Sequence, residues 1–460
     1  MDIPSEKRRH GFVDWPGAVI SRDRFAGELT ARFGEKALDV LLPRVSTQKE
    51  KPVPGIDPWT VLKIRTFDAV REFEALRADA VLLPAFASRA FIEEIEAETA
   101  LPIVSPMDAL RAELSRQYPS GGRIGVLGVD RSLFERHFPE KIWTPLYPER
   151  DVVNGREDAL ADACRDLARR GAESIIAGDV ALPFAQGLRE RGFPVVDVLR
   201  VYVGYAAALP LAEKARPFKI GVVGGVGPAA TVDLLDKIVR NTPARRDQEH
   251  LKVAVEMNPQ IPDRTAYLLD GGADPTVALY AACKRLEATG ASVIAIPCNT
   301  AHAFVGRIQP FLSIPIVNML RETAEYIRRN HGGCSKVGLL ATSGTIDSRV
   351  YHEAIGAAGF ETLVPDAENQ ERVMNAIYGP RGVKAGFTEG ECVADLSRAL
   401  ASLVERGAEA VILGCTELPL LLARNEAFPI AGKTVAVLDP TDILAKKCVD
   451  MGWRAAGKSD

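Results

Sequence analysis

Two of the seven cysteines in this 460-residue sequence stand in polar surroundings that suit proton transfer. Cys298 lies in the motif PCNT at residues 297–300, and Cys415 lies in the motif GCTE at residues 414–417. Each motif follows a short apolar run, which predicts a thiol at the carboxyl end of a strand and just before a helix, where open α/β sheets bind ligands. A helix N-terminus lowers the pKa of a nearby thiol, and a thiol with a pKa near ambient pH can donate or accept a proton.

Inversion of an α-carbon requires two such groups. One group removes the α-proton from one face of the carbon, and the other delivers a proton to the opposite face. Two thiols that face each other across a cleft between two lobes would meet this requirement. A cysteine is more often a small buried apolar residue, and we interpret the remaining ones in that way: Cys164, Cys283, Cys334, Cys392 and Cys448. The polar neighbours of Cys298 and Cys415 favour chemistry at these two.

Polar residues near the two motifs predict a carboxylate-binding site. Backbone N–H groups and the side chains of Asn299, Thr300 and Thr416 suit an α-carboxylate, because the N-termini of helices bind anions. Arg264 follows a proline-containing turn and would hold a second carboxylate with two parallel hydrogen bonds. Lys384 would add a point charge. On spacing alone, a solvated surface position explains either cation equally well.

The glycine-rich segment GGVGP at residues 224–228 resembles a phosphate-binding loop only in part. It lacks the full GxGxxG spacing, and Pro228 stands where the helix would begin to donate N–H groups. We therefore expect a turn that brings the backbone close to a small substrate. The cysteines and the six histidines show no metal-ligand spacing. We expect no cofactor and no metal.

Apolar runs alternate with helical patterns along the second half of the chain. The strand candidates are residues 220–225, 293–296, 314–317, 337–342 and 411–413, and the helix candidates are residues 231–239, 277–286, 348–358 and 393–404. This alternation predicts an α/β fold with parallel sheets flanked by helices.

The first half of the chain repeats this plan. Residues 80–91, 101–104, 124–127 and 171–183 match residues 293–304, 314–317, 337–340 and 407–419 in the same order. We interpret this as a tandem duplication with its seam near 212–217, giving domains 1–214 and 218–460, each of two lobes. Ala85 and Asp179 take the places of the two cysteines, so the first copy should not catalyse thiol chemistry.

Composition excludes several classes of partner and location. Lys and Arg number 57 against 61 Asp and Glu, a net charge of -4, which predicts no nucleic-acid or membrane-surface partner. No run reaches the roughly 18 apolar residues of a membrane span. The basic residues at 7–9 are not followed by an apolar signal core. Scattered cysteines without a pairing pattern favour a reduced, cytoplasmic setting.

Five motifs together resemble the aspartate racemases of the Asp/Glu/hydantoin racemase superfamily: residues 224–228, 247–250, 261–265, 297–302 and 414–419. The resemblance runs from Lys219 to about Arg424. It implies chemistry independent of pyridoxal phosphate, with Cys298 and Cys415 as the two bases. It also implies an α-carboxylate in the Cys-Asn-Thr loop and a side-chain carboxylate at Arg264 and Lys384.

Two departures separate the sequence from the glutamate racemase branch. That branch usually has a histidine where Glu417 stands, and an Asp-Ser-Gly start where this chain has Gly-Gly-Val at 224–226. Both favour interconversion of L- and D-aspartate. Glutamate remains open, because one methylene is worth only about 1–3 kcal/mol in discrimination.

Other activities of the same superfamily are alternative interpretations. A lyase or an isomerase could use one thiol and ignore the other, whereas decarboxylases of this type keep a single cysteine. A non-catalytic binding protein fits the first copy better than the second.

The expected partner is a small dicarboxylic amino acid. We further hypothesise that the first copy is an inactive internal partner, an internal pseudo-dimer that supports the second copy's cleft, and further homo-oligomerisation stays open. If residues 219–460 alone were fully active, the hypothesis that the first copy supports this cleft would be wrong.

Overall fold

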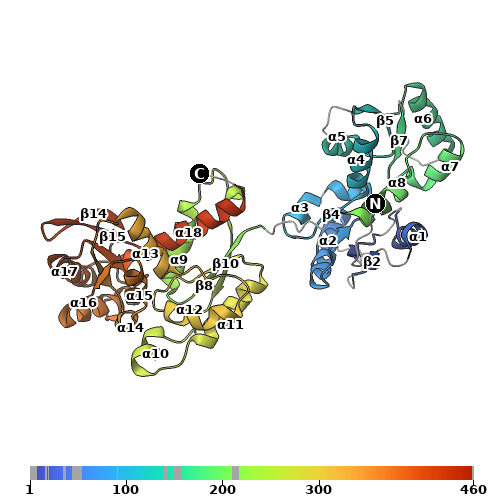
Figure 1. Ribbon diagram of the computed structural model, residues 1–460. Coiled ribbons are helices and arrows are strands. Elements are labelled where there is room, and N and C mark those ends of the chain that lie inside the picture. The colour runs from blue at the N-terminus through green and yellow to red at the C-terminus, as the bar shows by residue number, and fades with distance from the viewer. Residues whose placement is uncertain are drawn as a thin grey trace. The chain divides into compact units, whose positions relative to one another are not determined.

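The computed structural model describes residues 8–15, 18, 20–34, 38–43, 54–90, 92–138, 143–148, 157–209 and 217–457. The chain divides into two compact units, unit 1 (Met1–Pro217) and unit 2 (Phe218–Asp460), and each is considered by itself (Figure 1). Most of the seam expected near 212–217 lies outside the described residues.

The first lobe of unit 2 is a parallel sheet in the order β10-β8-β9. Its strands are β8 (Lys219–Gly224), β9 (Lys252–Met257) and β10 (Val293–Ala295). Its helices are α9 (Pro228–Asn241), α10 (Arg264–Asp270), α11 (Thr276–Ala288) and α12 (His302–Ile308). The strand expected at 314–317 is only a single β-bridge, between Ile316 and Ile294.

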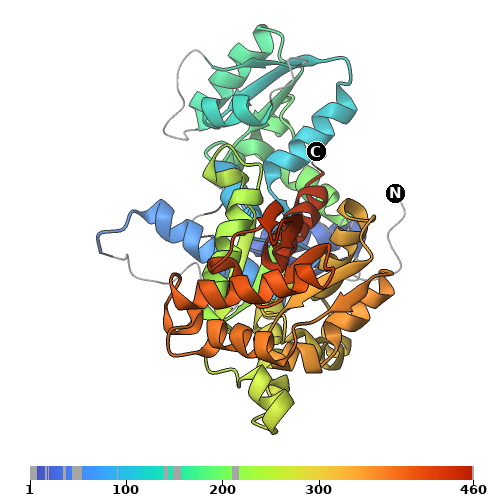
Figure 2. The ribbon, with the colours of Figure 1, turned by 90° about the vertical axis from the view of Figure 1, so that its left-hand side faces the viewer.

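The second lobe is a five-stranded sheet in the order β12-β11-β13-β15-β14, parallel except for β14. Its strands are β11 (Lys336–Leu340), β12 (Glu361–Leu363), β13 (Ala410–Leu413), β14 (Asn425–Ile430) and β15 (Lys433–Leu438). The helix expected at 348–358 begins later, as α15 (Val350–Ala357), after α14 (Ser343–Asp347) and a left-handed residue, Arg349. Helices α16 (Ala367–Tyr378) and α17 (Glu391–Glu405) lie side by side over one face (Figures 1 and 2).

One hydrophobic core joins the two lobes of unit 2. Helices α13 (Met319–Asn330) and α18 (Pro440–Ala455) pack in it together with α9. The same cluster holds Ile220 and Val222 of β8 and Val337 and Leu339 of β11. Strands β11 and β13 are buried on both faces, which explains why they read as continuous apolar runs in the sequence.

The described residues of unit 1 also form two parallel sheets. The first has the order β2-β1-β3-β4, with β1 (Arg8–Phe12), β2 (Leu38–Leu41), β3 (Ala80–Leu82) and β4 (Ile103–Val104). The second has the order β6-β5-β7, with β5 (Gly122–Leu127), β6 (Trp143–Leu146) and β7 (Ser174–Ala177). The α-helices are α1 (Arg22–Phe33), α2 (Pro58–Ala75), α3 (Ile92–Glu96), α4 (Pro106–Gln117), α5 (Arg131–His137), α6 (Glu157–Arg169), α7 (Ala185–Glu190) and α8 (Val198–Ala208).

The two units share the order of six strands, β2-β1-β3 like β9-β8-β10 and β6-β5-β7 like β12-β11-β13, and several local details. Strands β3 and β10 cover matched residues, and so do β7 and β13 and the 3-10 helices after them, η2 (Leu182–Phe184) and η6 (Leu418–Leu420). The N–H of Gly178 donates to Leu127 O at 2.8 Å, and the matched N–H of Gly414 donates to Leu340 O at 2.6 Å. The α/β class with parallel sheets flanked by helices is therefore confirmed in both units.

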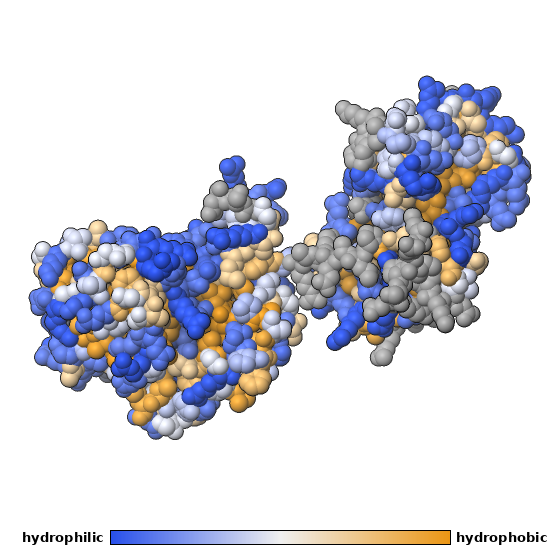
Figure 3. All heavy atoms as spheres, viewed as in Figure 1, coloured by the Kyte–Doolittle hydropathy of each residue, from blue (hydrophilic) through white to orange (hydrophobic). Residues whose placement is uncertain are grey.

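The described surface is mainly hydrophilic, with apolar patches between the polar regions (Figure 3). Strand β9 contributes Val253, Val255 and Met257 to the exposed apolar residues of unit 2. Among the described residues, no helix has the length and hydropathy that a bilayer crossing requires.

Candidate active site

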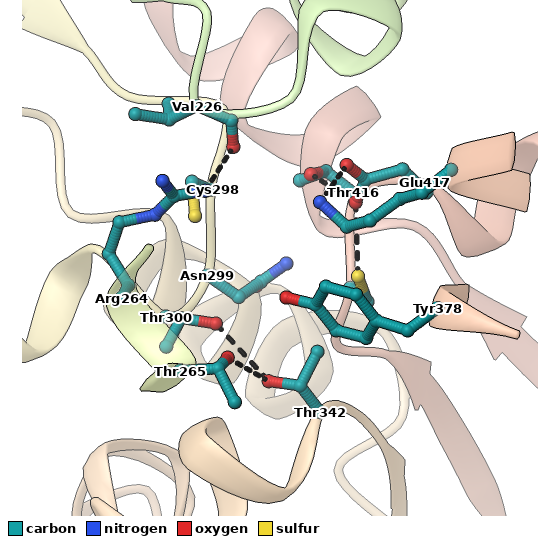
Figure 4. A pocket seen from close by; sticks show the side chains of 12 residues that line it. Val226, Arg264, Thr265, Cys298, Asn299, Thr300, Thr342, Tyr378, Thr416 and Glu417 are labelled. Atoms are coloured by element: carbon teal, nitrogen blue, oxygen red, sulfur yellow. Dashed lines mark hydrogen bonds and ion pairs between the residues drawn. The ribbon is translucent and has the colours of Figure 1, made fainter. Parts of the chain in front are cut away.

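A small cavity in unit 2 collects residues from both lobes (Figure 4). All of the residues expected from the sequence line it: Arg264, Cys298, Asn299, Thr300, Lys384, Cys415 and Thr416. Val226, from the turn expected to approach the substrate, also lines it, and so do four residues that were not expected as site residues: Thr265, Thr342, Tyr378 and Glu417. Its volume is about 10 Å³, which is roughly the room of one water molecule.

The turn that carries Cys298 is fixed by a buried histidine. The Cys298 N–H donates to Ile296 O at 2.8 Å, and the Cys298 carbonyl oxygen lies 2.9 Å from His302 Nδ1. Met319 N–H donates to His302 Nε2 at 3.2 Å, so Nδ1 is the ring nitrogen that carries the proton. Burial lowers the pKa of His302 to about 4. The imidazole is therefore neutral at neutral pH and holds the Cys298 backbone in place.

Arg264 is a buried cation beside Cys298. It begins α10, whose N-cap Asp263 accepts from Ala266 N–H at 2.8 Å. Its two terminal nitrogens donate to backbone carbonyl oxygens at 3.3, 3.1 and 3.1 Å, those of Ile261, Pro262 and Val226. Its Nε is buried and has no partner among the described residues. Figure 4 shows the guanidinium next to the Cys298 sulfur. The alternative of a solvated surface cation therefore does not hold for Arg264.

Cys415 faces a carboxylate. Its Sγ–H donates to Glu417 Oε2 at 3.0 Å, and Glu417 Oε1 pairs with Lys384 Nζ at 3.1 Å. Burial first, and then the Glu417 charge, raises the pKa of Cys415 well above its ordinary value, while Lys384 opposes the rise. The expectation that a helix N-terminus lowers this pKa is wrong. A 3-10 helix of three residues, η6, follows the thiol here, and the nearest charge is negative.

The glycine-rich turn reaches Glu417 closely. Gly227 has φ +133°, and a Cβ on it would lie 2.4 Å from Glu417 Oε1. Only glycine permits this approach. On the other side, the Lys384 ammonium lies 5.1 Å from the centre of the Tyr378 ring, and burial raises the pKa of Tyr378 to about 12.

Hydroxyl groups connect the two lobes around the cavity. Thr416 Oγ1 donates to Pro297 O at 3.1 Å, so this hydroxyl is engaged within the protein. Thr342 Oγ1, from the loop after β11, lies 3.3 Å from Thr300 Oγ1 and accepts from Thr265 Oγ1 at 3.4 Å. Contacts of this kind hold the cavity closed between the lobes.

Asn299 presents donors to the cavity. Tyr351 OH donates to Asn299 Oδ1 at 2.6 Å, which orients the amide. Its Nδ2 is buried without a partner, and within the described residues no acceptor contacts the backbone N–H of Asn299 or Thr300. Buried donors of this kind are costly unless a ligand or water accepts from them. The turn at 298–300 therefore suits a carboxylate.

Comparisons with known proteins identify the family of unit 2. The family model described as Asp/Glu/hydantoin racemase matches residues 223–448. The chain is 27% identical over 239 residues to the broad specificity amino-acid racemase RacX of Bacillus subtilis (strain 168), covering 50% of this chain and 96% of that protein. Unit 2 belongs to the Asp/Glu/hydantoin racemase family. It is thus an amino-acid racemase of the Asp/Glu racemase superfamily.

Two further relatives of unit 2 differ in how much of their own length the similarity covers. The glutamate racemase of Shewanella sp. (strain MR-7) is 29% identical over 163 residues, which cover 35% of this chain and 56% of that protein. Among solved structures, the Picrophilus torridus aspartate racemase is 27% identical and covers 51% of this chain and 94% of that one, with a TM-score of 0.45.

Proposed function

We propose that unit 2 interconverts the enantiomers of a small dicarboxylic amino acid, with aspartate as substrate, and uses Cys298 and Cys415 as its two acid/base groups without pyridoxal phosphate. The observation that carries this proposal is that the two thiols line one cavity from different lobes and have different partners. Two groups on opposite sides of a bound carbon are what inversion requires.

The surroundings of the thiols assign their resting roles. The guanidinium of Arg264 stands beside Cys298. Cys415 keeps its proton, and its S–H group donates a hydrogen bond to Glu417. The Cys298 thiolate removes the α-proton, so that a C–H bond breaks and an S–H bond forms. Cys415 delivers its proton to the opposite face of the carbanion, and the two thiols finish the cycle with exchanged protonation states.

Donors around the cavity match the charges of the substrate. We place the α-carboxylate on the Asn299 side chain and on the backbone N–H groups of Asn299 and Thr300, which also stabilise the enolate-like charge of the carbanion. The side-chain carboxylate is assigned to the free Nε–H of Arg264, with Lys384 as a more distant charge. Because the cavity has the room of one water, the lobes must separate for the substrate to enter.

A broader substrate range is a second candidate. Lys384 is already paired with Glu417, so one of the two cations assigned to the side-chain carboxylate is neutralised. The relative RacX is a broad specificity amino-acid racemase. A neutral amino acid such as alanine would need only the α-carboxylate donors.

Proton NMR in D2O tests the proposal directly. Purified protein without added pyridoxal phosphate is incubated with L-aspartate, L-glutamate or L-alanine. Loss of the α-proton signal is followed by NMR, and formation of the D-enantiomer is followed by chiral chromatography. We expect both with aspartate, and a loss of activity of at least about a hundredfold in Cys298→Ala and in Cys415→Ala. Cys283→Ala, a buried cysteine outside the cavity, is the matched control and should stay active.

The outcomes separate the candidates. Equal rates with alanine would replace the dicarboxylate assignment by the broader range. Exchange without inversion that survives one of the two cavity substitutions would refute the two-thiol mechanism and favour a lyase or an isomerase. Activity that requires pyridoxal phosphate would refute it as well.

A further inference from the structure

In unit 1, the residue in the place of Cys415 accepts from backbone N–H groups whose counterparts in unit 2 have no acceptor among the described residues. Asp179 follows β7, and its two carboxylate oxygens accept from consecutive backbone N–H groups across the unit. Oδ1 accepts from Phe86 N–H at 3.0 Å, and Oδ2 accepts from Ala87 N–H at 3.0 Å. These N–H groups belong to the turn after β3, in the other lobe of unit 1. A single carboxylate therefore bridges the two lobes.

The matched turn of unit 2 identifies what this carboxylate replaces. Phe86 and Ala87 align with Asn299 and Thr300, and the strands before them, β3 and β10, cover matched residues. In unit 2 these N–H groups have no acceptor among the described residues, and the buried Nδ2 of Asn299 has none either. The same turn is thus occupied by a carboxylate in unit 1 and open to the cavity in unit 2.

We propose that Asp179 is a built-in carboxylate ligand of unit 1: its side chain occupies the carboxylate-binding turn that corresponds to residues 298–300 of unit 2 and holds the two lobes of unit 1 closed on each other. This assignment goes beyond the racemase activity. Only the equivalence to a substrate carboxylate rests on the function proposed for unit 2.

The surroundings of Asp179 fit a permanent occupant. Gly178, the residue before it, packs so closely that an added Cβ would lie 2.2 Å from Val129 Cγ2. Phe86 and Ala181 are buried and apolar. Burial raises the pKa of Asp179, and the N–H groups of Phe86 and Ala87 oppose that rise. A partly buried carboxylate between apolar residues is costly unless it is hydrogen-bonded, and these two N–H groups satisfy it.

Removing the side chain should leave a vacancy that a free monocarboxylate can fill. We would prepare the full-length chain with Asp179→Ala and add acetate at constant ionic strength, with chloride as the reference anion. Hydrogen exchange of the peptide that contains Phe86 and Ala87 is measured by mass spectrometry. We expect exchange at these amides to become at least about tenfold faster and to slow again, saturably, with acetate.

Two further variants make the test specific. Asp179→Asn keeps the shape of the side chain, so acetate should have no effect on it. Asp130→Ala removes another carboxylate of unit 1 that accepts a backbone N–H, that of Leu133 at 2.8 Å, and should change neither the exchange at 86–87 nor its response to acetate. If Asp179→Ala fails to fold, Asp179→Ser takes its place.

The result that overturns the proposal is a lack of acetate protection in both Asp179→Ala and Asp179→Ser. Equal protection in the wild type or in Asp130→Ala would also overturn it, because acetate would then act elsewhere. None of these readouts uses racemase activity, so the outcome is independent of the function proposed for unit 2.

Discussion

Unit 1 and unit 2 arrange six strands in the same order, β2-β1-β3 like β9-β8-β10 and β6-β5-β7 like β12-β11-β13, but they carry different residues at the ends of these strands. After β10 and β13, unit 2 carries Cys298 and Cys415, and after β3 and β7, unit 1 carries Ala85 and Asp179. The apolar pattern of the strands sets the fold, whereas a few polar residues at the strand ends set the chemistry. We interpret the pair as a tandem duplication in which the first copy kept the scaffold and lost the thiols.

The residues near the two cysteines also differ between the units, with apolar residues of unit 1 in the places of polar residues of unit 2. Ala181, fully buried, takes the place of Glu417, and the buried Phe86 takes the place of Asn299. Unit 1 thus fills with apolar side chains the positions from which unit 2 presents polar groups to its cavity. Single-residue exchanges between the units can test this contrast.

The largest effect is expected from Cys415→Asp, which installs the unit 1 residue in unit 2. The new carboxylate would accept from the N–H groups of Asn299 and Thr300, as Asp179 does from Phe86 and Ala87. Racemisation should fall at least about a thousandfold, because an acid/base group is lost and the substrate site is filled. Activity and stabilisation by L-aspartate in thermal unfolding are the measurements.

Cys415→Ala is the control for this exchange. It lacks the thiol but leaves the site open, so it should be inactive and still be stabilised by L-aspartate. If Cys415→Asp is stabilised as much as Cys415→Ala, the carboxylate does not occupy the substrate site, and the parallel between the units fails.

His302→Leu should have the next largest effect, on the stability of unit 2 alone. It leaves the Cys298 carbonyl and the Met319 N–H buried without partners, which costs roughly 2–4 kcal/mol. His302→Gln, which can donate and accept, should recover part of this loss. Urea unfolding followed by circular dichroism measures the effect, and an unchanged unit 2 transition would show that His302 does not support the turn.

The pH dependence of stability should change in the same variant. The folded pKa of His302 is about 4, below its ordinary 6.5, so the unfolded state takes up the proton first as the pH falls. Its contribution is complete above pH 6.5 and is lost between pH 6.5 and about 4, by about 1.4 kcal/mol per pH unit. His10 in unit 1, whose pKa burial also lowers to about 4, should keep its own slope when His302 is replaced.

The smallest effect is expected from charge changes around Cys415. Glu417→Gln removes a charge that raises the pKa of Cys415, so the corresponding limb of the pH–rate profile should move to lower pH. Lys384→Met removes a charge that lowers this pKa, so that limb should move to higher pH. We expect about a tenfold loss of kcat in each, less than for removal of an acid/base group. Shifts in the same direction would contradict the Cys415–Glu417–Lys384 arrangement.

Much of the fold and of the site composition followed from local patterns. Apolar runs located β8, β10, β11 and β13, and residues that follow each of these four strands line the cavity. The family resemblance is confirmed by the match at residues 223–448. The roles of Arg264 and Lys384 remain proposals, although both line the cavity.

The remaining features depend on contacts between distant segments. Thr342 reaches the cavity from the loop after β11, and no local motif marks it. Glu417 had a local signal, two residues after Cys415, but its effect on the thiol depends on burial and on side-chain direction. The short bridge at Ile316 shows a further limit, since an apolar run resembles a strand even where only one residue pairs.

The cavity between the two thiols has a consequence for the timing of catalysis. With the room of one water molecule, it admits a substrate only after the Thr416–Pro297 and Thr265–Thr342 contacts separate. Every cycle then contains an opening and a closing of the lobes in addition to two proton transfers. Movements of this kind take microseconds to milliseconds. Opening of the lobes would then be a step of every turnover, and the hydroxyl contacts between the lobes would oppose it.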